Sequence, residues 1–207
     1  MTDYAQTAPD DVVAQTVHAL EERGFTVQTV DTLKDAKEAV AKLIPNGSSV
    51  FTATSKTLEA TGITALINEG YEYEAIRPKL TAMMMNEPEN VVGRKKLTAA
   101  VDYVVGSVAA LTEKGELLIA SATGSQIAPE AYGASHVIYV ISTKKIVKDI
   151  ADGFRRVEEY IFPQERERVR AQYNKPDLKT YFSKLFMYLQ DYDNRVVVVL
   201  VKEPAGF

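Results

Sequence analysis

Residues 48–59 decide the fold and read Ser-Ser-Val-Phe-Thr-Ala-Thr-Ser-Lys-Thr-Leu-Glu. Residues 48–52 predict a short buried strand, and the polar residues 53–57 predict a loop. A helix is expected next, with Glu59 just inside it and Gly70 at its end. A strand that leads through a polar loop into a helix is the building block of α/β proteins.

Two helices and one strand are expected before this stretch. The first helix begins near Thr7 and stops at Gly24, and residues 25–30 form a strand. The second helix begins at Thr32, where Asp35 completes a capping pattern.

Strands and helices continue to alternate along the rest of the chain. Further strands are expected at residues 71–76, 101–106, 117–121, 136–141 and 195–201, and further helices at residues 146–160 and about 179–190. The sequence therefore predicts an α/β fold with a mainly parallel sheet flanked by helices. We expect one domain over residues 1–207, in which residues 160–207 form a helical extension and a final strand.

Composition excludes several kinds of chemistry. The 207 residues contain no cysteine, which rules out disulfides, thiol nucleophiles and iron–sulfur ligation by this chain. His18 and His136 are too few for a histidine-rich metal site, and we expect neither a metal nor a cofactor. With 24 basic and 28 acidic residues the formal charge is −4, which argues against nucleic acid as a partner. The polar N-terminus and the lack of an apolar run of about 20 residues predict a cytoplasmic protein without a membrane partner.

The polar loop after residue 52 is the first candidate site. Ligands of α/β proteins gather where strands end and helices begin. Thr54, Ser55 and Thr57 offer hydroxyl groups there, next to free N–H groups at the start of the helix, and Glu59 is a candidate acid or base. The alternative is ordinary helix capping by Ser55 or Thr57.

A second loop follows residues 117–121 and is the other candidate. Gly124 permits close backbone approach to a ligand, and its neighbours can hydrogen-bond one, although a plain turn remains the alternative. The candidates here are Thr123, Gly124, Ser125 and Gln126.

Two charged residues complete the candidate site. Lys145 follows a predicted strand and offers a positive charge to an anion. Glu113 is a candidate carboxylate base or nucleophile, with a solvated turn as the alternative. We expect both loops to emerge at one edge of the parallel sheet and to form a single site for a small anion there.

The remaining features favour packing or solvation. Residues 83–85 are three methionines, typical of adaptable packing, and the charged residues 94–96 and 164–170 are expected on solvated faces. We expect four aromatic residues near the C-terminus to pack in the core or against a second copy of the chain: Tyr181, Phe182, Phe186 and Tyr188.

Four short blocks, in this order and spacing, resemble the LUD (lactate utilisation) domain family. They are residues 55–59 (SKTLE), 101–106 (VDYVVG), 112–117 (TEKGEL) and 145–150 (KIVKDI), and the resemblance covers roughly residues 12–157. Gly106, which closes the second block, is a further candidate ligand-binding residue. The resemblance implies a fold similar to ribose-5-phosphate isomerase and CoA transferases.

The family includes lactate-utilisation protein C, one of three proteins needed for L-lactate oxidation. The resemblance thus implies a non-redox component of lactate or related organic-acid metabolism, with a cysteine-bearing iron–sulfur protein as partner. This chain has Ser107, Ala109 and Lys144 where the closest branch of the family favours other residues, and the loop at residues 122–126 also differs from that branch. The resemblance therefore predicts the fold better than it predicts the function.

Two alternatives to this role stay open. One is a stand-alone enzyme of the isomerase or CoA-transferase type that acts on a small anion, such as a sugar phosphate, a carboxylate or a CoA thioester. The other is a partner-binding module that uses the aromatic C-terminal segment.

Overall fold

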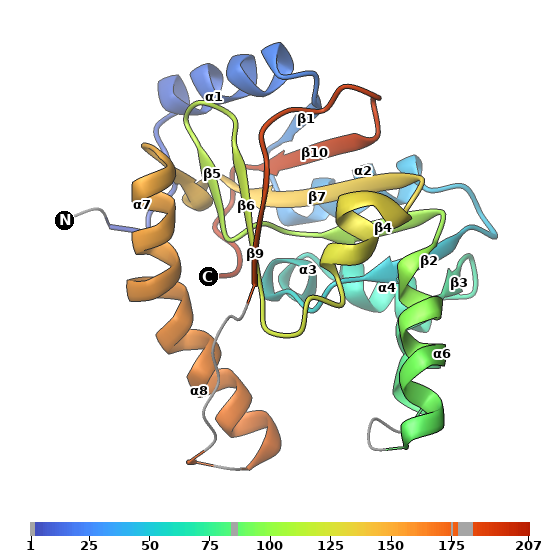
Figure 1. The fold of residues 1–207 in the computed structure, drawn as a ribbon. Helices are drawn as coiled ribbons and strands as arrows, with labels where there is room; N and C mark the ends of the chain where they lie inside the picture. The colour runs from blue at the N-terminus through green and yellow to red at the C-terminus, as the bar shows by residue number, and fades with distance from the viewer. Residues whose placement is uncertain (1–2, 84–86, 175, 178–183) are drawn as a thin grey trace.

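The computed structural model describes residues 3–83, 87–174, 176–177 and 184–207. Ten strands in this part of the chain form two sheets, and helices cover them (Figure 1). Met84 and Met85 of the methionine run, and Tyr181 and Phe182 of the aromatic group, lie outside the described residues.

The larger sheet has six strands, and every pair in it is parallel. In spatial order they are β1 (Thr26–Val30), β10 (Val196–Val201), β7 (His136–Ser142), β4 (Tyr103–Gly106), β2 (Ser49–Thr52) and β3 (Glu74–Ala75). The predicted mainly parallel sheet flanked by helices is confirmed.

The central strands of this sheet are buried on both faces, which explains why β10 is continuously apolar. In β10, Val198 and Leu200 point into one core layer, whereas Val199 and Val201 point into the other. One layer includes α1, α5 and the smaller sheet, and the other includes α2, α3 and α4. The helices are α1 (Asp10–Glu22), α2 (Leu33–Leu43), α3 (Lys56–Ala60), α4 (Ile63–Glu69), α5 (Ile76–Ala82), α6 (Pro88–Ala99), α7 (Ile150–Arg155) and α8 (Phe162–Tyr173).

The sequence predicted some helix ends correctly and others wrongly. The predicted capping box exists, because the Thr32 side chain accepts from the Asp35 N–H and the Asp35 carboxylate accepts from the Thr32 N–H. Pro9, not Thr7, precedes the first helix. The helix expected up to Gly70 breaks into α3 and α4, since Gly62 adopts a left-handed φ of 73° between them.

The smaller sheet was not expected from the sequence. Its order is β8 (Ile146–Val147), β5 (Ala110–Thr112), β6 (Leu117–Ser121) and β9 (Lys184–Tyr188). The predicted helix at 179–190 is wrong for its described part, because β9 pairs antiparallel with β6. Short apolar runs fit a strand or a helix equally well, and pairing with β6 selects the strand.

The helix predicted from residue 146 begins later. Ile146 and Val147 form β8, and α7 then begins after Asp149, whose side chain accepts from the Asp152 N–H. A π-helical turn, Arg156–Ile161, joins α7 to α8, and together they form one long helix beside the body (Figure 1).

Gly24 is a conformational constraint at the end of α1. Its φ is +85°, and a Cβ added there would lie 1.9 Å from the Asp191 carbonyl oxygen. We expect Gly24→Ala to lower the free energy of unfolding by more than the roughly 1–2 kcal/mol of left-handed strain. Urea denaturation measures this.

Gly47→Ala is the matched control. Gly47 has a φ of +83° and nothing within 4 Å of its added Cβ, so this variant reports strain alone. Equal destabilisation of the two variants would contradict the proposed clash with Asp191.

Candidate functional site

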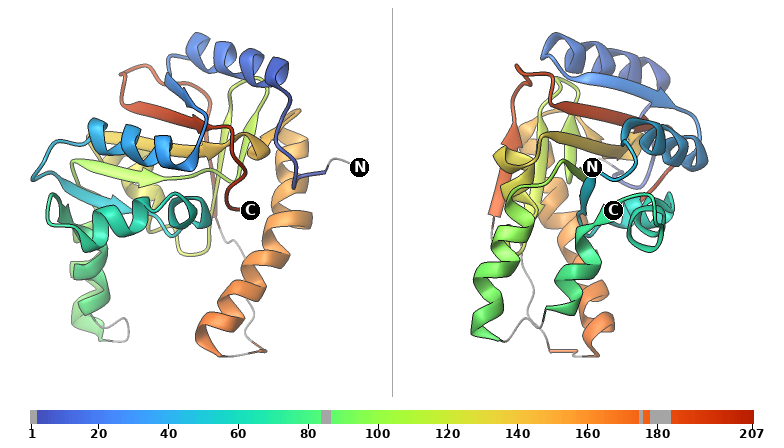
Figure 2. Two further views of the ribbon diagram at one scale, coloured as in Figure 1. Left: turned by 180° about the vertical axis from the view of Figure 1, so that it is seen from behind. Right: turned by 90° about the vertical axis from the view of Figure 1, so that its right-hand side faces the viewer.

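A pocket of about 340 Å³ lies where the two sheets meet α8. The pocket is lined by residues 53–56 after β2, by residues 107–109 after β4, and by residues 120–123, 125 and 126 at the end of β6. Residues 161–169 and Phe207 close the other side, and the chain ends next to α3 in the back view (Figure 2). The pocket thus lies at the carboxyl ends of parallel strands, where ligands of α/β proteins gather.

Most of the sequence-predicted site residues come together in this pocket. Its lining includes Thr54, Ser55, Glu59, Thr123, Ser125, Gln126 and Lys145. The two loops meet for a reason other than the expected one, because β6 belongs to the smaller, mixed sheet and not to the parallel sheet. Ligand binding by these residues stays a prediction.

Three other candidate residues, Thr57, Gly106 and Gly124, are neighbours of residues that line the pocket. Thr57 is fully buried, and its hydroxyl lies 3.4 Å from the Ser107 hydroxyl that donates to it. Gly106 packs against a carboxyl group, since a Cβ there would lie 2.8 Å from Glu130 Oε1. Gly124 has a left-handed φ of +81°, and its N–H donates to Ser121 Oγ at 2.9 Å.

Glu113 lies elsewhere. It lines a separate depression with His18, Glu22 and Arg23, beside α1. Its backbone N–H donates to the Val147 carbonyl at 2.8 Å. The structure therefore does not place this carboxylate near Glu59 in the candidate site.

Arg77 is a pocket residue that the sequence analysis missed. It lies in α5, its Nε donates to the Thr52 carbonyl at 3.1 Å, and its guanidinium stacks 4.6 Å from the centre of the Phe51 ring. This helix has seven residues and directly follows the two-residue strand β3, so the sequence offers no long periodic pattern to indicate which way a side chain points. Arg168 and Glu165 of α8 also line the pocket, although their charged stretch was expected to be solvated.

The pocket contains paired and unpaired charges. Lys56 pairs with Glu59 at 2.5 Å, and Arg168 pairs with Glu165 at 2.6 Å. Within the described residues, neither Arg77 nor Lys145 forms an ion pair.

Lys145 is buried in the pocket wall. Only 3% of it is exposed, and its Nζ donates to Ser107 Oγ and to the Val108 carbonyl, each at 3.0 Å. Burial, helped by the positive charges of Arg156 and Lys144, holds the pKa of the Lys145 amine well below its usual value. Lys145 therefore keeps a positive charge less readily than Arg77 does.

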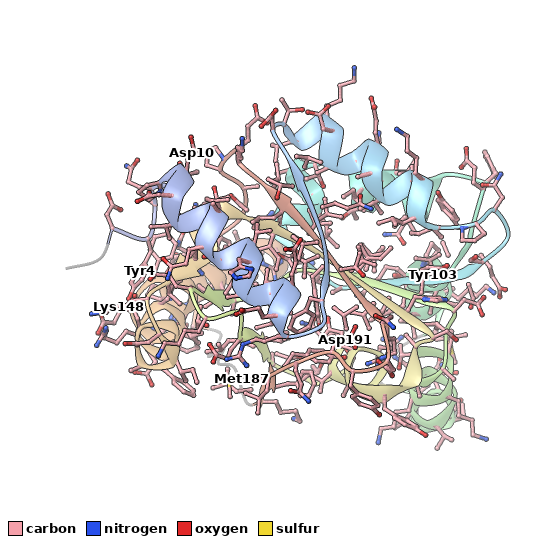
Figure 3. The ribbon with its side chains drawn as sticks, turned by 90° about the horizontal axis from the view of Figure 1, so that it is seen from above. Tyr4, Asp10, Tyr103, Lys148, Met187 and Asp191 are labelled. Carbon is pink, nitrogen blue, oxygen red and sulfur yellow. The ribbon has the colours of Figure 1, made fainter. Side chains whose placement is uncertain are left out.

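Arg156 lies fully buried nearby. Its Nη1 donates to the Ala109 carbonyl, and its guanidinium lies 5.8 Å from the Tyr4 ring and 5.2 Å from the Tyr160 ring. Figure 3 shows Tyr4 beside α7, and the Tyr4 hydroxyl donates to Asp152 Oδ1 at 2.8 Å. Burial lowers the pKa of Arg156 to about 10.

Together these contacts define the chemistry the site can support. Two basic side chains without acidic partners among the described residues, two carboxylates and several hydroxyl groups line one pocket, which suits a small anion. Within the described residues, no group of three histidine or acidic side chains is placed to hold a metal ion. No helix in the same ranges has both the length and the apolar character to cross a membrane.

Comparison with protein families assigns the chain to one of them. The model of the LUD domain matches residues 13–181. The chain belongs to the LUD domain family. A comparison with curated proteins finds no match.

One solved structure matches this LUD domain over nearly its whole length, and others match part of it. A DUF162 family protein from Deinococcus radiodurans is 13% identical, with a TM-score of 0.55 over 97% of this chain and 99% of that one. Ribose 5 phosphate isomerase A from Neisseria gonorrhoeae is 10% identical, with a TM-score of 0.35 over 57% of this chain and 54% of that one. For eIF2B beta from Chaetomium thermophilum the identity is 23% and the TM-score 0.38, over 60% of this chain and 42% of that one.

We expect the Glu130 carboxyl behind Gly106 to make the stability of the protein depend on pH. Neither of its oxygens has a hydrogen-bond partner among the described residues, and burial raises its pKa well above the usual 4.5. Above the usual pKa the Glu130 carboxyl ionises in the unfolded chain but stays protonated in the folded chain. The protein therefore loses stability as the pH rises through the pKa of the folded state. We expect Glu130→Gln to remove this loss, seen as a flatter dependence of the urea midpoint between about pH 5 and pH 8.

Glu21→Gln, at an exposed position of α1, is the control and should keep the slope of the unmodified protein. If Glu130→Gln follows the same slope, the Glu130 carboxyl does not control the pH dependence.

Proposed function

We propose that this LUD domain binds a small organic-acid anion in the pocket between its two sheets. The Arg77 guanidinium carries the proposal, because it lines the pocket and has no acidic partner among the residues described. Guanidinium groups stay protonated in proteins and match the two oxygens of a carboxylate.

The groups around Arg77 suit the same ligand. Ser55, Thr123 and Ser125 bring hydroxyl groups from the two loops, which can donate hydrogen bonds to an anion. A volume of about 340 Å³ is at the scale of ordinary small-molecule sites.

We further propose that the protein serves lactate or related organic-acid metabolism in the cytoplasm as a non-redox component. Membership of the LUD family and the absence of cysteine support this role, since electron transfer would then fall to an iron–sulfur partner protein. The ligand is an organic acid in this view, and the LUD domain binds or presents it.

A second candidate function is an enzyme that acts alone on the bound anion. The observation that favours it is the pair of carboxylates in the pocket wall, Glu59 and Glu165, each of which can exchange a proton with a ligand. Turnover of an organic acid or sugar phosphate by the isolated chain, lost in Glu59→Gln or Glu165→Gln, would favour the enzyme. Copurification of the protein with an iron–sulfur protein, without turnover alone, would favour the accessory role.

Anion binding is tested by thermal shift and calorimetry with pyruvate, lactate and dihydroxyacetone phosphate. Ligand at 100 times its Kd should add about 2.7 kcal/mol to stability. We expect Arg77→Gln to weaken binding about tenfold or more, because a hydrogen bond to a charged group is worth about 1.5–3 kcal/mol. Ser125→Ala removes one hydroxyl and should weaken it less.

Arg170→Gln makes the same substitution on α8, where Arg170 is paired with Glu167 and does not line the pocket, and should bind normally. Unchanged affinity in both Arg77→Gln and Ser125→Ala, with folding verified by circular dichroism, would refute the site.

A further inference from the structure

The Lys145 amine has the hydrogen-bond partners of a neutral amine. Its Nζ has two acceptors, Ser107 Oγ and the Val108 carbonyl, each at 3.0 Å. The Ser107 hydroxyl donates its own hydrogen to Thr57 Oγ1 at 3.4 Å, which leaves its lone pairs to accept from Lys145. A neutral amine has two N–H groups and one lone pair, so both donors are satisfied and the lone pair stays free.

The surrounding charges favour the neutral form. Lys145 faces Arg156 and Lys144, and no carboxylate among the described residues pairs with it. Both cations and the burial lower the pKa of the amine. A desolvated lysine next to other cations is a nucleophile at neutral pH.

The same pocket offers the second half of a binding site. Arg77 can hold a carboxylate or phosphate, and Lys145 lines the pocket that Arg77 also lines. A ligand with an anionic group and a carbonyl group would engage both side chains.

We propose that Lys145 condenses with the carbonyl group of an anionic substrate, a 2-oxo acid or a sugar phosphate, to form an imine. This proposal rests on the proposed anion site, and it names the chemical class of the ligand.

The step balances without an oxidant or a reductant. The Nζ lone pair attacks the carbonyl carbon, the two hydrogens of the amine pass to the carbonyl oxygen, and that oxygen leaves as water when the C=N bond forms. Ser107 touches Nζ and is placed to relay one of these protons. A protonated imine withdraws electrons from the adjacent carbon, so it activates the bonds of that carbon toward proton loss or cleavage.

Reductive trapping tests the imine directly. The full chain is incubated with pyruvate or dihydroxyacetone phosphate, sodium borohydride is added, and intact mass and peptide mapping follow. With pyruvate, a reduced imine adds the mass of pyruvic acid less one oxygen atom. We expect one label per chain, at Lys145, with far less at Lys56, which lines the same pocket but pairs with Glu59.

Lys145→Arg keeps a cation and cannot form the imine, so its label should be lost, and lactate, which lacks the carbonyl group, should give none. Labelling of the unmodified chain at Lys145 does not depend on the folding of any variant.

The outcomes separate the two proposals. Thermal shifts with these anions but no preferred label at Lys145 would overturn the imine and leave the anion site standing. Absence of both shift and label would overturn the anion site together with the imine.

Discussion

Two buried basic side chains, Lys145 and Arg156, hold the connection between the two sheets, and the pocket depends on them. Residues 107–109 leave the parallel sheet at Gly106 and enter the smaller sheet at Ala110. Lys145 binds Ser107 and the Val108 carbonyl, and Arg156 binds the Ala109 carbonyl. A buried backbone carbonyl needs a donor, and a buried N–H group needs an acceptor, so these hydrogen bonds satisfy both where the chain crosses between the sheets.

This arrangement also explains the long helix that ends in α8. Arg156 begins the π-helical turn, and the rings of Tyr4 and Tyr160 flank its guanidinium, so the turn is fixed to the body of the protein. The helix then continues past the pocket, where Glu165 and Arg168 form its outer wall. The same buried guanidinium therefore joins the sheets, positions α8 and lowers the pKa of Lys145.

Sequence patterns predicted what depends on neighbours along the chain, and missed what depends on distant partners. The Thr32 capping box and the apolar strand 195–201 were clear because capping and burial on both faces leave local signals. Both polar loops of the pocket were also predicted, because a run of polar residues after an apolar strand is a local signal too. The strand Lys184–Tyr188 and the pocket role of Arg77 were not, since pairing with β6 and the direction of one side chain are set by tertiary packing. Glu113 had the right chemistry for the site but lies in another depression.

The position of β10 has a consequence for biosynthesis. This strand lies between β1 and β7, and among the described strands it is the partner of β1, for example Val197 with Thr26. A ribosome releases the N-terminal segment first, yet β2 to β9 are all made before the strand that β1 must pair with. The α1–β1 unit therefore waits, with its strand unpaired, until β10 has been made. Pairing over such a separation in sequence is slow, so this edge is where a nascent chain is most exposed to misassembly.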